Sequence, residues 1–533
     1  MRPINMKSAF LKTRLRMAVI VAVASLAAMA HAAAPGITGT GTVGTFNLTA
    51  QPSYISQPDG QSVYSWGYGC STQPAAYNYA PAAITTGFCG TMQVPGPTLI
   101  VTEGQTVTVN LSNNLPAPAG NTSLLFPGFQ VSTSGGVPGL LTQEAPASGT
   151  VTYTFVAATP GTHSYYSGTQ SDLQVEMGLY GAIIVLPANV PSVCSSGLSA
   201  SNLAAEAHWG EKDFRLAASA YDHAKTCYDR EYLFQFSEID PRIHSQVLDQ
   251  VIAAGSCTAG AVGCSLQVAT EPYHPAYFMI NGRSMPDDMD PNYAVQYPHQ
   301  PYNGNPHLHP GEVVLLRIIG QGRWQHPFHE HANHVRILAR DGNLILSQSD
   351  QTLLAGPALF TTTTTPGVTM DGLFYYTGRG LNWDMYGHNP KSGDPAATLP
   401  CVPDANGYNT GDPTAINYYE WCQDHNKPLQ VAPFGDVAGG GPATLPDPNI
   451  LTNGAWYGGS PYLGADATVR AVGASGVTPP SGTIANSPSG EAGFAFMWHS
   501  HNEREITTNN AFPGGMMMMM LVDSREFVID ESN

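Results

Sequence analysis

The chain has 533 residues, of which 42% are hydrophobic and only 11% are charged, and its formal net charge at pH 7 is −18. A surface with this excess of acidic groups repels nucleic acid and anionic membranes and attracts cations, which argues against a nucleic-acid-binding role. Abundant glycine (56) and proline (43) favour many turns over long amphipathic helices, as in an all-β protein.

Residues 1–32 predict an export signal. Five basic residues accompany an apolar run that is shorter than a membrane span, and the small-x-small pattern Ala30-His31-Ala32 follows it. We therefore expect a periplasmic or extracellular chain with no membrane anchor after cleavage. Cleavage would remove five of the 21 basic residues and none of the 39 acidic ones, which leaves a mature net charge of about −23.

Eight cysteines follow this segment. An even number at short separations in an oxidising compartment favours structural disulfides over metal ligation. Proximity along the chain predicts neighbouring pairs: Cys70 with Cys89, Cys194 with Cys227, Cys257 with Cys264, and Cys401 with Cys422.

The first predicted domain covers residues 36–188. It contains PGPTLIVTEGQTVTVNLSNNLP (95–116), where threonine and asparagine alternate with valine and leucine before a proline-rich turn. This alternation is typical of a half-buried strand. The segments VTYTFVAATPGTHSYYSG and GLYGAIIVLP supply further strands around a Pro-Gly turn, so we expect a β-sandwich.

A linker of residues 189–229 precedes a second predicted sandwich at 230–525. Segments such as EYLFQFSEIDP, EVVLLRIIG and HVRILARDG have strand length and are separated by glycine and proline turns. An irregular insertion from about 380 to 490 interrupts this domain and is expected to be fixed by the pair Cys401 and Cys422. A third sandwich within 390–525 is the alternative.

Five consecutive methionines (516–520) lie within a strand-like pattern near the end of the chain. Methionine can bind Cu(I), so a copper-binding stripe is conceivable. Core packing is the favoured interpretation.

Two histidine pairs mark the candidate site. His329 and His331 lie two residues apart in QHPFHEHANH, and His499 and His501 repeat this spacing in FMWHSHNERE. On a strand, this spacing places both side chains of a pair on one face, where they can serve one metal ion or two adjacent ions. A purely structural histidine network is the alternative, but the repetition of the pair favours metal binding.

Three segments together resemble the multicopper oxidase family. PGPTLIVTEGQTVTVNLSN resembles the opening of that family, HPFHEH resembles its HPxHLHGH motif, and WHSHNERE followed by PGGMM resembles its HCHxxxHxxxGM terminus. The longer form HSHNEREITTNNAFPGGM is similar to a bacterial branch of manganese oxidases and related exported copper proteins. The resemblance implies tandem cupredoxin-like Greek-key β-sandwiches with a long irregular insertion.

Catalysis in this family uses four His-x-His motifs around three coppers, and a blue copper held by a cysteine thiolate and two histidines. By this resemblance, His329 and His331 match trinuclear-site ligands, as do His499 and His501, and His326 matches a blue-copper ligand. Half of the trinuclear ligand set is therefore expected.

The other ligands of the family are missing. NTSLLFPGF (121–129) has no histidine where the family carries HWHG, and Tyr166 and Gly168 stand at the ligand positions of the second motif. Ser500 stands at the blue-copper cysteine and Glu505 at its second histidine. A hydroxyl is a hard and weak ligand, whereas blue copper depends on a soft thiolate, so we expect no blue copper.

Two further groups have weaker signals. Glu330, Glu503 and Glu505 could add oxygen ligands, but solvated charges on the outer face are the favoured interpretation. His307 and His309 form another pair before a Pro-Gly turn, and polar strand residues are favoured over an edge metal site.

The sequence thus predicts an exported copper-binding protein that lacks the blue-copper cysteine and half of the trinuclear-site histidines. The expected cofactor is copper, one or two ions, or another divalent metal. Two alternatives stay open: a copper-dependent oxidoreductase that acts on Mn(II) or phenols with O2, and a non-catalytic cupredoxin scaffold. The expected partners are metal ions, with no nucleic acid and no membrane, and another subunit of a homo-oligomer could supply missing histidines.

Overall fold

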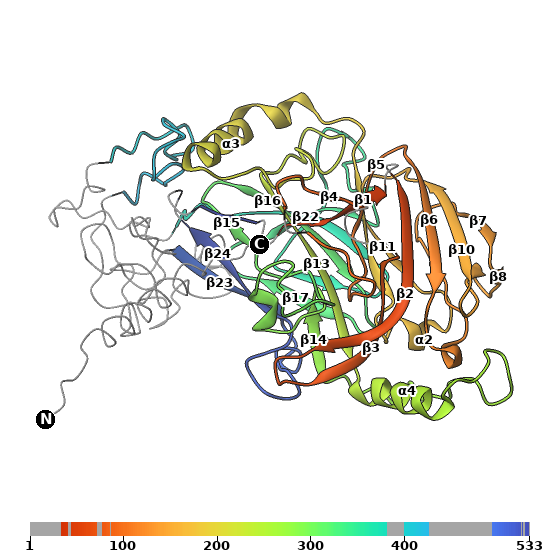
Figure 1. The fold of residues 1–533 in the computed structure, drawn as a ribbon. Helices are drawn as coiled ribbons and strands as arrows, with labels where there is room; N and C mark the ends of the chain where they lie inside the picture. The colour runs from red at the N-terminus through yellow and green to blue at the C-terminus, as the bar shows by residue number, and fades with distance from the viewer. Residues whose placement is uncertain are drawn as a thin grey trace, which may run out of the picture.

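The fold consists of two pairs of β-sheets (Figure 1). Strands β1 to β12 build one pair and strands β13 to β24 build the other, and the described residues contain no third pair. The predicted fold class, all-β with tandem sandwiches, is confirmed. The structure is a computed structural model that describes residues 33–40, 44–71, 77–85, 87–380, 399–425, 493–523, 525 and 528–531.

The first sandwich pairs two five-stranded sheets. One has the order β11-β12-β5-β1-β4 and the other has the order β3-β2-β6-β10-β7. The strands are β1 (Gly36–Thr40), β2 (Thr45–Ser56), β3 (Ser62–Cys70), β4 (Tyr77–Ala80), β5 (Leu99–Thr102), β6 (Thr106–Asn113), β7 (Ser132–Gly135), β10 (Thr150–Val156), β11 (Gly161–Tyr166) and β12 (Tyr180–Leu186), with a small hairpin of β8 (Val137–Pro138) and β9 (Gln143–Glu144).

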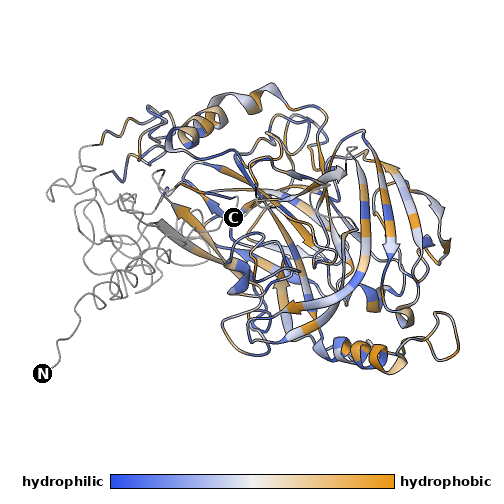
Figure 2. Ribbon diagram, viewed as in Figure 1, coloured by the Kyte–Doolittle hydropathy of each residue, from blue (hydrophilic) through white to orange (hydrophobic). Residues whose placement is uncertain are grey.

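The alternation that predicted a strand at β6 places its apolar side chains in the core. Val107, Val109 and Leu111 are buried, whereas Thr106 is exposed and Asn110 is half-buried. Figure 2 shows the same alternation of hydrophobic and hydrophilic residues along neighbouring strands of this sheet. Burial of one face of each strand supplies the main stabilisation of such a sandwich.

The second sandwich pairs a seven-stranded sheet with a five-stranded one. The larger sheet has the order β14-β13-β16-β22-β18-β19, with β20 also paired to β18, and the smaller sheet has the order β15-β24-β23-β17-β21. The strands are β13 (Arg230–Ile239), β14 (Tyr277–Ile280), β15 (His307–Leu308), β16 (Val313–Gly320), β17 (His326–Glu330), β18 (Val335–Arg340), β19 (Asn343–Leu344), β20 (Ala358–Leu359), β21 (Thr361–Thr364), β22 (Thr369–Tyr375), β23 (Gly493–Ser500) and β24 (Met517–Asp523).

Helix α4 (Pro241–Ala254) follows β13 and begins directly after Asp240. The Asp240 side chain accepts a hydrogen bond from the backbone N–H of Arg242, and proline occupies the first turn, which is a favourable N-terminus. Ile243 and Val247 pack into the core of the first sandwich. The other helices are η2 (Ala117–Ala119), α2 (Ser171–Gln174), η3 (Ser192–Ser195), α3 (Gly197–Trp209) and η4 (Asp287–Met289).

A buried carboxylate ties the two sandwiches together. Asp371 on β22 accepts hydrogen bonds from the backbone N–H of Thr162 on β11 at 3.1 Å, from the Thr162 hydroxyl at 2.5 Å and from the Tyr221 hydroxyl at 2.5 Å. Arg317 on β16 lies 3.8 Å from the same carboxylate. The polar contact is surrounded by apolar clusters that contain residues of both sandwiches, so the domains pack as one unit.

All four predicted disulfides are confirmed. They join Cys70 to Cys89, Cys194 to Cys227, Cys257 to Cys264 and Cys401 to Cys422. The predicted export signal at 1–32 and most of the predicted insertion lie outside the described residues. Of the helices that the structure describes, none combines the length and apolar character needed to cross a membrane.

The methionine run belongs to the core of the second sandwich. Met516, Met518 and Met520 are fully buried and pack with Phe328 and Trp498, whereas Met519 is half-buried. The favoured interpretation of this run as core packing is therefore confirmed for the described strand.

We expect Met518→Ala to lower the free energy of unfolding by about 2–5 kcal/mol, because it removes a fully buried side chain and leaves a cavity. The matched change Met519→Ala on the same strand should cost clearly less. Urea denaturation of both variants measures the difference. Equal losses would show that the alternation along β24 does not decide burial.

Candidate metal centre

The candidate centre depends on the pairing of strands β17 and β23. These strands are antiparallel, and His329 lies opposite His499, with Phe328 opposite Ser500. Side chains alternate between the two faces of a strand, so both histidine pairs lie on one face of the sheet. The predicted grouping of His329, His331, His499 and His501 is what the structure shows.

The four imidazole rings lie close together. The ring centroids of His329 are 4.9 Å from His331, 5.6 Å from His499 and 4.9 Å from His501. His331 and His499 are 5.3 Å apart, and His499 and His501 are 5.6 Å apart. A metal bound by an imidazole nitrogen at about 2 Å places each ring centroid roughly 3 Å away, so rings on a shared ion stand about 5 Å apart. The observed centroid separations are of this size, but no three of these four histidines bring ligand nitrogens within 4.8 Å of one another, so the rings would have to turn before they shared an ion.

The centre opens to solvent on one side. His329 is 7% exposed and His499 is 9% exposed, whereas His331 is half-buried and His501 is exposed. On the opposite face of the same strands, Phe328 and Trp498 are fully buried in the core. The centre is therefore a surface site on a rigid base.

Burial and mutual proximity keep these imidazoles neutral. Burial, followed by the charges of the neighbouring histidines, lowers the pKa of His329 to about 4 and that of His331 to about 3. Burial also lowers the pKa of His499. A neutral imidazole is the form that binds a metal, so these rings are ready ligands at neutral pH.

Two hydrogen bonds orient the buried rings. His329 Nδ1 lies 2.8 Å from the Thr361 hydroxyl on β21, and His499 Nδ1 lies 2.7 Å from the backbone carbonyl oxygen of Ser500. Contacts of this kind fix the tautomer and direction of a metal-binding histidine, which would then bind through Nε2. Sequence reasoning did not identify Thr361, which lies 32 residues from its partner.

His326 lies apart from this group. It lies three positions before His329 on the strand, so it faces the inner side of the sheet, where Ser500 also lies. Its Nδ1 is 2.9 Å from a Glu505 carboxylate oxygen and its Nε2 is 2.9 Å from Glu238. The Ser500 hydroxyl donates to the same Glu505 oxygen at 2.5 Å. Glu238 was not foreseen, because every residue of its strand is buried and the pattern carries no signal.

The inner group is a buried ion triad. His326, Glu238 and Glu505 are all buried. Burial alone would lower the pKa of His326, but the two carboxylates outweigh it and raise this pKa to about 9. A protonated imidazole donates from both nitrogens and has no lone pair for a metal. The residues at the blue-copper position therefore form a hydrogen-bonded ion group in which His326 offers no lone pair to a copper ion.

The expectation of solvated glutamates is wrong for two of the three. Glu330 is fully buried and accepts a hydrogen bond from the Thr362 hydroxyl at 2.7 Å, and burial raises its pKa to about 8. Glu505 is buried in the ion triad. Only Glu503 is exposed. Glu330 points away from the histidine face because it lies between His329 and His331 on the strand.

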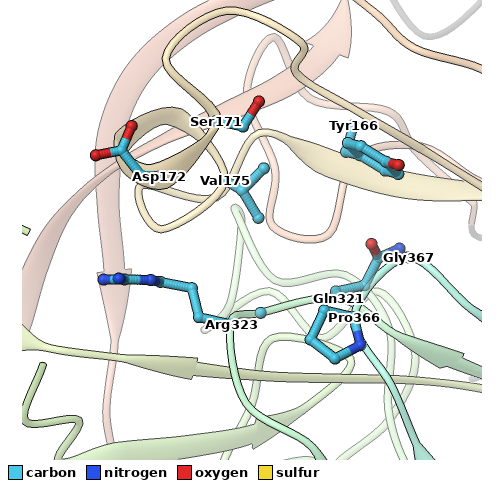
Figure 3. Close-up of a pocket in the computed structure, with 9 residues that line it drawn as sticks. Tyr166, Ser171, Asp172, Val175, Gln321, Arg323, Pro366 and Gly367 are labelled. Carbon is cyan, nitrogen blue, oxygen red and sulfur yellow. The ribbon is translucent and has the colours of Figure 1, made fainter.

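The matching positions of the first sandwich have no histidine and no room for one. Leu125 and Tyr166 pair through their backbones, and a side-chain carbon added at Gly168 would lie 2.8 Å from the Leu125 side chain. Tyr166 lines a cavity of about 340 Å³ between the sandwiches. Figure 3 shows Tyr166 and Asp172 on one side of this cavity and Arg323 with Gly367 on the other.

His309 belongs to a buried charge network. It lies 2.8 Å from Glu211, which also pairs with Arg230 at 2.7 Å, and Arg230 contacts Glu312 at 2.5 Å. Ligand atoms of Glu211, His309 and Glu312 lie within 4.8 Å of one another. Arg230 already forms ion pairs with both of these carboxylates. His307 lies on β15 (His307–Leu308), and both His307 and His309 are fully buried. The preference for polar strand residues over an edge metal site stays a prediction.

The comparisons with known proteins concern the first domain most directly. Residues 77–190 match the family model described as multicopper oxidase. The chain is 36% identical over 124 residues to multicopper oxidase MCE of Talaromyces pinophilus, a match that covers 21% of this chain and 20% of that protein. It is 38% identical over 93 residues to copper resistance protein A of Escherichia coli, a match that covers 17% of this chain and 14% of that protein. These findings show that about a fifth of the chain is similar to multicopper oxidases.

The chain spans about a fifth or less of the length of the curated relatives that it matches. Among solved structures, a blue copper oxidase from Nitrosomonas europaea aligns over 90% of this chain and 85% of that chain, with 14% identity and a TM-score of 0.43.

The ion triad predicts a pH-dependent contribution to stability. The pKa of His326 in the folded protein is about 9, above the ordinary value of 6.5, so protonation stabilises the fold. This contribution is fully present below pH 6.5 and is lost as the pH rises through 9. We expect His326→Gln to lower the free energy of unfolding by roughly 3 kcal/mol more at pH 6 than at pH 9.5.

Urea denaturation of wild type and His326→Gln across this pH range measures the effect. His223→Gln is the matched control. Among the described residues, the His223 side chain has hydrogen bonds only with the Gln351 carbonyl oxygen, at 3.1 Å, and with the backbone N–H of Lys225. A loss that stays constant from pH 6 to 9.5 would contradict an imidazolium at position 326.

Proposed function

We propose that this protein is an exported copper-binding protein, related to the multicopper oxidases, that holds one or two copper ions with His329, His331, His499 and His501. The observation that carries the proposal is the grouping of four imidazoles on one sheet face by the β17–β23 register. Imidazole ligands suit copper, and ring separations of 4.9–5.6 Å match rings around a shared ion.

The residues at the other ligand positions of the family argue against laccase-type chemistry. Ser500 and Glu505 replace a soft thiolate and an imidazole, and both are engaged with His326 in the ion triad. In the first sandwich, Leu125 occupies the space beside Gly168 where a histidine side chain would be needed. The proposal therefore contains neither a blue copper nor a complete trinuclear centre, and His326 is not among the ligands.

Bound copper would supply an ion that can change oxidation state. The protein would contribute orientation and access: the Thr361 hydroxyl and the Ser500 carbonyl oxygen fix two rings, and exposed His501 lets solutes approach from solvent. The strongly acidic surface would raise the local concentration of metal cations.

A second candidate function is the copper-dependent oxidation of reduced metal ions such as Mn(II), as in the manganese oxidase branch that the C-terminal motif resembles. The exposure of His501 favours it, because a substrate could reach a copper ion directly. Oxygen consumption by the copper-loaded protein with Mn(II) or a phenol, abolished in His329→Ala, would support this function. An inactive protein with full copper occupancy would exclude it.

We expect the purified protein, after loading with Cu(II) and desalting, to retain one or two coppers per chain by mass spectrometry. Its EPR spectrum should show nitrogen ligation, and its visible spectrum should lack the intense thiolate band. His331→Ala and His501→Ala should each lose most of the copper, because each removes a ligand of the centre.

His223→Gln serves as the control for these variants, since His223 lies outside the histidine centre, and it should keep the wild-type copper content. Three or more coppers per chain would overturn the proposal and require ligands from elsewhere in the chain or from another subunit. A wild-type protein that retains no copper would favour the scaffold role.

A further inference from the structure

A cavity of about 470 Å³ lies next to the histidine centre, on the outer face of the larger sheet of the second sandwich. It is bounded by strands β18, β20 and β22, and its lining includes Asn333 and His334, which follow His331 closely in the chain. The Asn333 side chain donates to the Tyr375 carbonyl oxygen at 2.8 Å, which holds this turn against β22. The cavity is therefore a fixed feature of the sheet.

The lining combines an apolar floor, an aromatic wall and one cation. Val313, Leu373 and Ala358 supply aliphatic surface, and Tyr375 is 50% exposed beside them. Arg336 donates from Nη1 to the Gly356 carbonyl oxygen at 2.6 Å, which orients its guanidinium at the cavity edge. This is the one hydrogen bond of the Arg336 side chain among the residues that the structure describes.

The charge of this lining contrasts with that of the chain. Among the residues that the structure describes, no carboxylate lines the cavity, whereas the whole sequence has 39 acidic and 21 basic residues. A guanidinium presents planar paired donors that match a carboxylate, and its attraction is strongest where no acidic group competes. An anion is thus repelled by most of the surface and attracted here.

The cavity connects to the candidate metal centre through aromatic rings. The His334 ring, at the edge of the cavity, lies 5.7 Å from Phe360, and Phe360 lies 5.9 Å from His329. The rings of His334 and Phe360 would therefore lie between a molecule in the cavity and His329, a proposed copper ligand.

We propose that this cavity binds a planar aromatic carboxylate, with its ring against Tyr375 and Leu373 and its carboxylate on Arg336. The proposal names a ligand class for the region around the copper centre, and in that sense it rests on the proposed function, although binding itself needs no metal. The apolar floor selects the ring, and the single cation selects the acid over a neutral analogue.

Isothermal titration calorimetry of the full-length protein without metal tests this inference, with 4-hydroxybenzoate as the probe and 4-hydroxybenzyl alcohol as its neutral counterpart. We expect saturable binding of the acid and at least tenfold weaker binding of the alcohol. Arg336→Gln should weaken binding of the acid at least tenfold, and Tyr375→Leu should weaken both probes.

Arg340→Gln is the matched control, because Arg340 is also exposed on β18 but does not line the cavity, and it should bind the acid like the wild type. Equal affinities for the two probes, equal losses in both arginine variants, or no saturable binding would each overturn the inference. Copper content measured on the same protein separates the two proposals, since acid binding without copper retention removes only the proposed function.

Discussion

The register between β17 and β23 is the constraint on which the histidine centre and the buried ion triad both depend. His329 lies opposite His499, so two histidine pairs about 170 residues apart in sequence meet on one face. A slip of one residue would turn each side chain of the shifted strand to the other face and bury imidazoles in the core. Phe328 on β17 and Trp498 on β23, whose ring centroids are 6.1 Å apart in that core, oppose such a slip because the one on the shifted strand would leave the core.

The two faces of these strands carry different chemistry. On the outer face, four imidazoles surround a common region that solvent reaches through His501. On the inner face, two carboxylates hold a protonated imidazole, and burial makes each member depend on the others. Loss of one partner from a buried ion group typically costs about 3–5 kcal/mol, because it leaves a charge without compensation. The inner group therefore stabilises the strand pair that carries the outer one.

Local spacing predicted part of this arrangement. The two-residue interval within each histidine pair fixed the shared face, and short cysteine separations gave the four disulfides. The position of His326 follows from its three-residue offset from His329, yet the family resemblance directed attention to copper rather than to that offset. Glu238 could not be anticipated, because its strand is buried on both faces and its contact with His326 spans 88 residues.

The two buried glutamates show why general tendencies failed here. Carboxylates are usually solvated, which favoured an exposed Glu330 and Glu505. Strand alternation instead turns Glu330 to the inner face, where the Thr362 hydroxyl satisfies one oxygen, and Glu505 finds His326 and Ser500. Tertiary partners that are remote in sequence decided both cases, and those partners also decide which residues remain available to a metal.

X-ray absorption at the copper edge of the loaded protein tests the central claim most directly, because it reports the ligand atoms of the bound ion. Imidazole-type nitrogen scattering without any sulfur contribution is the predicted result, since the described centre consists of histidines, and Met516, Met518 and Met520 pack in the core. A copper–sulfur distance in the spectrum would contradict the account and place the ion elsewhere in the chain.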